Sequence, residues 1–106
     1  MKSRPVVALE AVGEDLQLAC DYFAARVPGL DEKFVERYFA ITDKIAANAE
    51  IFPLKFDDYR RALIPKSNYA VYYFVADSQS VIVAVVDARR DPRLMRDLVR
   101  GRRDNW

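Results

Sequence analysis

The second half of the sequence contains two apolar runs in which apolar and polar residues do not alternate: YAVYYFVA at 69–76 and VIVAVV at 81–86. Both runs are rich in the β-branched and aromatic residues that favour strands. A sheet with one face in water normally alternates apolar and polar residues along each strand. The two runs therefore predict strands that are buried on both faces, and both faces of the sheet need cover.

Turn-forming residues divide this half of the chain into a three-stranded antiparallel meander. The segments PKSN at 65–68 and DSQS at 77–80 are rich in residues that favour turns. We expect these turns to join strands over 60–64, 69–76 and 81–88.

The first half of the chain has the spacing of helices instead. Apolar residues recur three or four positions apart from about Ala11 to the Pro28-Gly29 pair, and again after Asp31. Pro28 and Gly29 end the first helix, and Asp31 is a suitable N-cap for the second. Two helices joined by so short a turn pack as an antiparallel hairpin. A short strand at 5–9 is expected before them.

The remaining segments are a connection and a C-terminal helix. Residues 46–59 are expected to form the connection, because Pro53 prevents the second helix from continuing. Asp91-Pro92 is a typical helix start, and we expect a short helix over 93–99 that ends at Gly101.

Together these elements predict one α+β domain spanning 1–106: an N-terminal strand and a helical hairpin packed on a three-stranded meander, followed by a short C-terminal helix. The hairpin can cover only one face of the sheet in a two-layer domain. The C-terminal helix and the 46–59 connection could cover the other face, or a partner protein could. We favour a partner, because contiguous exposed apolar patches usually mark interaction sites.

The composition excludes several kinds of site. The chain has no histidine and a single cysteine, Cys20, so neither a zinc site nor an internal disulfide is expected. No apolar run is long enough to cross a bilayer, and the N-terminus lacks a secretory signal. We therefore expect a cytoplasmic protein with no metal, cofactor or small-molecule substrate, and no contact with membranes.

The C-terminal end is basic, although the net charge of the whole chain is only +1. Residues 1–88 hold ten Lys and Arg against thirteen Asp and Glu, a net charge of −3. Residues 89–106 hold seven Arg and three Asp, a net charge of +4. The asymmetry indicates a weakly acidic body with a basic end suited to an anionic partner.

Several segments, taken in their order, carry a resemblance to a known family. They are Asp15-Leu16 and Tyr22-Phe23 in the first helix, the strand RRALI at 60–64, the Tyr-Tyr strand YAVYYFV at 69–75, and VIVAVVDARRDP at 81–92, which runs into an arginine corner. In this combination the chain resembles the RelE/ParE superfamily of toxins from type II toxin–antitoxin systems. The resemblance covers about residues 6–95.

The resemblance implies one of two activities. RelE-like members are ribosome-dependent endoribonucleases that cut mRNA, whereas ParE-like members, which include plasmid-stabilisation toxins, are non-enzymatic poisons of DNA gyrase. Members of both branches are neutralised by a small cognate antitoxin, which for the second branch is ParD-like. A non-toxic binding domain with the same fold is a further alternative.

The residues favour the ParE-like branch over the ribonuclease. The body of the chain is net acidic, histidine is absent, and Asp87 or Ala88 lies where some nuclease members have histidine. A carboxylate is a poor neighbour for the phosphates of RNA. The two long helices also resemble those of ParE-like members. We therefore expect a gyrase poison without catalytic residues rather than an enzyme.

Three groups of candidate site residues follow from this comparison. For contact with gyrase or gyrase-bound DNA we expect Arg89, Arg90, Arg93, Arg96, Arg100 and Trp106. For contact with the antitoxin we expect Arg60, Tyr69, Val71, Tyr72, Tyr73 and Phe74. If the chain is a ribonuclease, we expect Arg61, Lys66, Arg90 and Tyr73 within a cationic cluster that also includes Lys55. Arg61 and Arg90 could instead form ion pairs with Asp57, Asp58 or Asp87.

Overall fold

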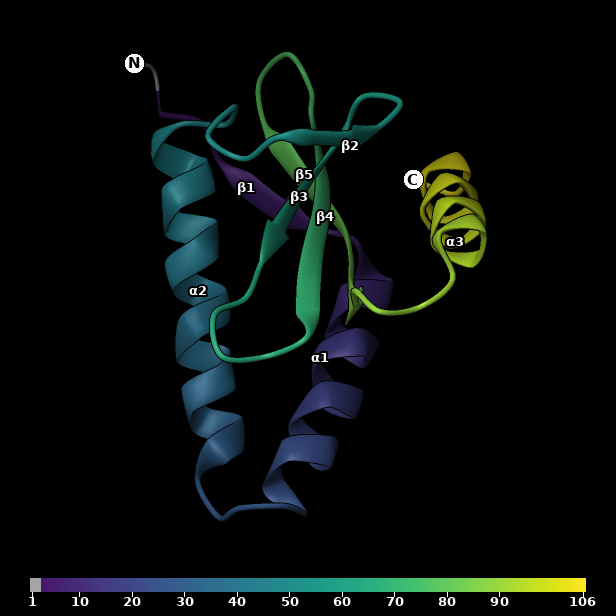
Figure 1. Cartoon of the computed structure of the whole chain (residues 1–106). Coiled ribbons are helices and arrows are strands. Elements are labelled where there is room, and N and C mark those ends of the chain that lie inside the picture. Colours follow the sequence, from purple (N-terminus) through teal and green to yellow (C-terminus); the bar gives the residue numbers. More distant parts are fainter. Residues whose placement is uncertain (1–2) are drawn as a thin grey trace.

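The computed structural model describes residues 3–106 as helices and strands around a single sheet. In chain order the elements are β1 (Val6–Ala8), α1 (Glu10–Ala24), α2 (Leu30–Ala47), β2 (Leu54–Phe56), β3 (Tyr59–Leu63), β4 (Tyr69–Val75), β5 (Ser80–Asp87) and α3 (Pro92–Asp104). The strand order is β1-β5-β4-β3-β2, with β1 parallel to β5 and the other neighbours antiparallel (Figure 1). The predicted α+β class, helical hairpin and meander are confirmed.

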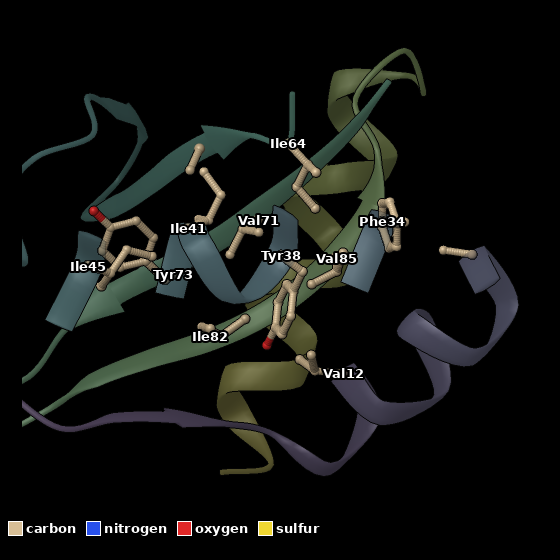
Figure 2. Close-up of a cluster of buried hydrophobic side chains, with 12 residues drawn as sticks. Val12, Phe34, Tyr38, Ile41, Ile45, Ile64, Val71, Tyr73, Ile82 and Val85 are labelled. Carbon is tan, nitrogen blue, oxygen red and sulfur yellow. The ribbon is translucent and has the colours of Figure 1, made fainter. Parts of the chain in front are cut away.

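The helical hairpin of α1 and α2 covers one face of the sheet. The apolar stripe of α2, predicted from its spacing, packs with strand side chains in one core (Figure 2). Its members include Phe34, Tyr38, Ile41 and Ile45 from α2 and Val71, Tyr73, Ile82 and Val85 from the sheet. Burial of such a side chain contributes about 1.5–3 kcal/mol, which fixes the hairpin on the sheet. Although α2 runs for 18 residues, no helix within residues 3–106 is apolar enough to cross a membrane.

The C-terminal helix α3 covers the opposite face of the sheet (Figure 1). Met95 and Val99 of α3 pack there with Tyr72 and Phe74 of β4 in a second core, against which Phe56 of β2 also packs. The non-alternating strands are therefore buried on both faces, as predicted. Our preference for a partner on this second face is corrected, because α3 and the end of the 46–59 connection supply the cover.

The helix α3 is longer than predicted, since it continues through Gly101 to Asp104. A glycine within a helix costs about 1 kcal/mol relative to alanine. Contacts of the last turns offset that cost, because Arg100 and Arg103 form ion pairs with the turn at 57–58. The extension could not be read from residues 93–101 alone, since its stabilising partners lie far away in the sequence.

The 46–59 connection contains a strand that the sequence analysis missed. The strand β2 pairs antiparallel with β3, which places Phe56 opposite Tyr59. Asp57 and Asp58 form the two-residue turn between them, and Asp57 has a φ of 50°, which aspartate adopts more readily than most residues. A strand of three residues is too short to show alternation in a sequence.

A bulge in β5 places two consecutive side chains on the same face of the sheet. Tyr72 lies opposite Ala84 but Tyr73 lies opposite Ile82, so Val83 is an additional residue on β5. Such a bulge shifts the alternation of side chains by one position. As a result, Val83 and Ala84 both belong to the core under α3.

Asp15 of α1 and Arg102 of α3 form a buried ion pair. The pair lies against the edge of β5 beyond Ala8, where β1 ends. The Asp15 carboxylate accepts a hydrogen bond from the Val85 N–H at 3.0 Å, and the Arg102 guanidinium donates to the Val83 carbonyl at 3.0 Å. Two further hydrogen bonds, of 2.6 and 2.8 Å, join the guanidinium of Arg102 to the carboxylate of Asp15.

This pair takes the place of a residue in a parallel strand. Such a residue would donate to one carbonyl of β5 and accept from the N–H two residues later, and Arg102 and Asp15 make these two contacts. Their side chains are only 19% and 8% exposed, so either charge alone would be poorly solvated. The pair therefore ties α1, β5 and α3 together.

We expect Asp15→Asn and Arg102→Met each to lower the free energy of unfolding by about 3 kcal/mol, because each leaves the charge of the other residue without a partner. Arg102→Met also leaves the Val83 carbonyl without its donor. The double variant should lose less than the sum of the two, since no lone charge remains. Urea denaturation followed by circular dichroism measures these changes.

Arg93→Met is the matched control. The side chain of Arg93 is 81% exposed, and its nitrogen lies 3.6 Å from the Asp91 carboxylate. The expected change is within the range of surface substitutions, about 0.5 kcal/mol. Equal losses for Arg102→Met and Arg93→Met would contradict the anchoring role of the buried pair.

Candidate anion-binding site

A small basic pocket lies where the N-terminal half of α3 meets β2, β3 and the end of β5. Its volume is about 210 Å³. The lining residues are Lys55, Phe56, Arg61, Tyr72, Ala88, Arg90, Pro92, Met95 and Arg96. We call it the cationic pocket, because four of these side chains are positively charged and none is a carboxylate.

Strand pairing places two of these residues side by side. Arg61 of β3 lies opposite Tyr72 of β4, so both side chains are on the sheet face that α3 covers. Arg90 comes from the turn that follows β5, where its N–H donates to the Asp87 carbonyl and its side chain lines the pocket.

The remaining two cations come from the elements that the sequence predicted least well. Lys55 is in β2, and Arg96 is in the second turn of α3. Pro92 also lines the pocket, so the N-terminal end of α3 lies beside it. The partial positive charge at a helix N-terminus adds to that of the four side chains.

None of the four cations of the pocket forms an ion pair within residues 3–106. The other arginines near the C-terminus do: Arg89 with Asp87, Arg93 with Asp91, Arg100 with Asp57, Arg102 with Asp15 and Arg103 with Asp58. Asp57 lies near Arg96 and Asp87 near Arg90, but each of these carboxylates is already hydrogen-bonded to another arginine. The four cations therefore keep a net positive charge that attracts an anion. The pocket is therefore suited to an anionic group that accepts several hydrogen bonds, such as a phosphate.

Two ion pairs beside the pocket keep their carboxylates charged. A hydrogen bond from Arg100 lowers the pKa of Asp57, and a hydrogen bond from Arg89 lowers the pKa of Asp87. A carboxylate whose pKa is lowered by folding stabilises the folded chain at pH values above the pKa it has in the unfolded chain. This stabilisation is lost as the pH falls through the pKa it has in the folded chain. At neutral pH both arginines are therefore held by aspartates and stay out of the cationic pocket.

Tyr72 adds a polar group to the floor of the pocket. Its side chain is only 3% exposed, and within residues 3–106 its hydroxyl has no hydrogen-bond partner. The neighbouring Tyr73 differs, because its hydroxyl donates to the Ala49 carbonyl at 2.8 Å in the other core. Among the described residues Ser80 Oγ is the one buried side-chain polar atom without a partner, so the Tyr72 hydroxyl is open to solvent and can donate to an anion in the pocket.

The lining residues include neither a carboxylate nor an imidazole, the groups that most often act as general bases. Within residues 3–106 no cluster of three or more His, Cys, Asp and Glu side chains is placed to hold a metal ion. The arrangement is therefore best suited to binding an anion.

A shallow apolar hollow adjoins the cationic pocket. It is lined by Phe52, Pro53, Leu54, Lys55, Arg61 and Leu63 and has a volume of about 310 Å³. Leu54 and Leu63 are 57% and 55% exposed. Since Lys55 and Arg61 line both cavities, one ligand could place an anionic group in the pocket and an apolar group in the hollow.

The residues expected for a ribonuclease separate in the structure. Arg61 and Arg90 meet in the cationic pocket, as does Lys55 of the wider cluster. Lys66 is exposed in the β3–β4 turn with a φ of 59°, and Tyr73 points into the opposite core. Tyr72, and not Tyr73, lies beside Arg61 in the pocket. Arg61 pairs with Tyr72 across β3 and β4, so these two side chains share a face. The alternation of side chains along β4 could have indicated this.

The residues expected to contact gyrase also separate. Arg90 and Arg96 line the pocket, whereas Arg89, Arg93 and Arg100 are paired with aspartates as described above. Trp106 is 58% exposed, and its ring packs edge-on against Phe74 with the centroids 5.3 Å apart. Asp57, Asp58 and Asp87 pair with Arg100, Arg103 and Arg89, so the alternative that Arg61 or Arg90 forms an ion pair with one of these aspartates is wrong.

Most residues expected to contact the antitoxin are buried in the chain. Val71, Tyr72, Tyr73 and Phe74 are each at most 3% exposed. Tyr69 is partly buried against Phe23 and Phe34, and Arg60 donates to the Phe52 carbonyl at 2.8 Å. These contacts with an antitoxin stay a prediction, and access to the four buried side chains would require a helix to move.

The fold is that of a small α+β domain whose C-terminal helix closes a cationic pocket. No family model and no curated protein matches the sequence. Among solved structures the chain is similar to a chain of the "Chromosomal ParDE TA system from P. aeruginosa", with a TM-score of 0.71 and 12% sequence identity. The match covers 80% of this chain and 96% of the other. At this identity the similarity shows a shared fold.

We expect Tyr73→Phe to lower the free energy of unfolding by about 1 kcal/mol, since it removes a buried hydrogen bond. Tyr72→Phe removes a hydroxyl without a partner and should leave the stability nearly unchanged. Chemical denaturation of both variants measures the difference. A loss for Tyr72→Phe as large as that for Tyr73→Phe would show that the Tyr72 hydroxyl has a partner within the chain.

Proposed function

We propose that the chain is the toxin of a type II toxin–antitoxin module. The observation that carries the proposal is the shared fold, which spans 96% of a chain from a ParDE system. The resemblance of the sequence to the RelE/ParE toxins, with a strand, a helical hairpin and a meander in order, favours the toxin over the antitoxin. The targets of both branches are intracellular, so we place the chain in the cytoplasm.

Within this class we propose a ParE-like poison of DNA gyrase as the first candidate. The similar solved structure is of a ParDE system. The cationic pocket supports this candidate, because it can hold a phosphate of gyrase-bound DNA yet offers no carboxylate or imidazole for acid–base chemistry.

A RelE-like ribonuclease is the second candidate, and a specific observation favours it. Arg61 and Arg90, which were expected for that activity, line one pocket together with Lys55, Arg96 and Tyr72. Clustered cations can stabilise the charge that develops on a phosphate during cleavage.

We propose a small ParD-like antitoxin as the partner. Both faces of the sheet are covered within the chain, so its first contact is proposed on exposed apolar side chains of the hairpin. Leu18 and Tyr22 of α1 are 71% and 41% exposed, and Phe39 of α2 is 56% exposed. Such apolar side chains are suited to an amphipathic helix or an extended segment of a partner.

We expect induced expression of the chain alone to arrest bacterial growth, with filamentation and gyrase cleavage complexes if gyrase is the target. Loss of mRNA by cleavage at codon boundaries would support the ribonuclease instead. Arg61→Gln/Arg90→Gln should abolish the arrest for either target, because it removes half of the cationic side chains of the pocket. Colony counts, DNA linearisation and mRNA end mapping measure these outcomes.

Arg93→Gln is the control for that experiment, because it removes an exposed arginine outside the pocket and should stay toxic. Growth arrest that persists in Arg61→Gln/Arg90→Gln would contradict a role for the pocket. Normal growth with the soluble unchanged chain would contradict the toxin proposal.

A further inference from the structure

We propose that α3 is a movable part of the cationic pocket: a nucleotide phosphate bound there draws in Arg96 and thereby holds α3 on the sheet. Binding of the phosphate and docking of α3 then stabilise each other. The inference deepens the proposed function, since it rests on the pocket through which the toxin would contact nucleic acid. It assigns that pocket a ligand class and a form of regulation.

The two halves of α3 are held very differently. The C-terminal half forms three ion pairs with the rest of the chain, through Arg100, Arg102 and Arg103. The N-terminal half forms none within residues 3–106, because Arg93 pairs only with Asp91 at the start of the same helix and Arg96 is unpaired. Met95 is the buried side chain that holds this half on the sheet.

Charge opposes docking of the N-terminal half when the pocket is empty. Docking brings Arg96 into a pocket with Lys55, Arg61 and Arg90, and like charges at close range repel. An anion between them reverses the sign of this effect, because it attracts all four side chains. A ligand that binds the docked state better than the undocked one shifts the equilibrium toward docking by the ratio of the two affinities.

The dimensions of the site indicate the class of ligand. A pocket of about 210 Å³ is smaller than the roughly 300–1,000 Å³ of typical small-molecule sites and suits a single phosphate group. The hollow that shares Lys55 and Arg61 is lined by apolar side chains, which suits the sugar or base attached to that phosphate. We therefore infer a phosphodiester of single-stranded nucleic acid rather than free phosphate.

The first experiment measures affinity with a 2′-O-methyl RNA pentanucleotide, which cannot be cleaved by attack of its own 2′-hydroxyl, and with inorganic phosphate. The pentanucleotide should bind at least tenfold more tightly than phosphate. Arg96→Gln should weaken pentanucleotide binding about tenfold, whereas Arg93→Gln on the same helix should change it less than twofold. Thermal unfolding of both variants checks that each is folded.

The second experiment follows hydrogen exchange of the backbone amides at 95–99. At a pentanucleotide concentration about ten times the Kd, protection of these amides should rise by up to about tenfold in the unchanged chain. The rise should be absent in Arg96→Gln at the same concentration. Unaltered protection in the unchanged chain at saturation would overturn the coupling.

The third experiment separates coupling from simple charge attraction. Asp58→Asn releases Arg103, loosens the C-terminal half of α3, and makes the chain more positive by one charge. Charge alone predicts tighter binding of the pentanucleotide, whereas coupling predicts weaker binding, because a smaller fraction of the chain has α3 docked. Tighter or equal binding would overturn the proposal.

The outcomes also distinguish this inference from the proposed function. A chain that arrests growth but binds neither probe would overturn the inference and leave the toxin proposal standing. A chain that binds the pentanucleotide through Arg96 without arresting growth would overturn the toxin proposal alone. Equal affinity for phosphate and pentanucleotide would overturn the assignment of the ligand class.

Discussion

The buried pair of Asp15 and Arg102 is the interaction on which the rest of the structure depends. A strand of only three residues, β1, leaves part of the edge of β5 uncovered, and this pair closes it. The same contact holds α3 over the second face of the sheet, and α3 in turn carries Arg96 into the cationic pocket. One ion pair thus joins the completion of the sheet, the second core and the candidate site.

Features that depend on local sequence were predictable. The four-residue apolar stripe of α2 and the non-alternating strands β4 and β5 are set by the spacing of side chains within one element, and the structure confirms both. The resemblance named Arg61 and Arg90, which the structure brings into one pocket. Tyr73 was expected beside them, but the alternation along β4 directs it to the opposite face.

Features that depend on distant partners were not predictable. Arg102 and Asp15 lie 87 positions apart, and nothing near either residue identifies its partner. The bulge at Val83 changes the phase of β5 without any proline or glycine to mark it. The second core and the extension of α3 follow from these contacts, which is why a partner protein was expected where α3 lies.

The bulge in β5 also supplies part of the anchor of α3. Ile82, before the bulge, lies opposite Tyr73, and Ala84, after it, lies opposite Tyr72, so each half of β5 keeps the faces set by β4. Val83 is the added residue between them, and its carbonyl accepts the hydrogen bond from Arg102. Loss of this single residue would leave the faces of the sheet unchanged but remove that acceptor, so the length of β5, as much as its composition, determines how firmly the C-terminal helix is attached.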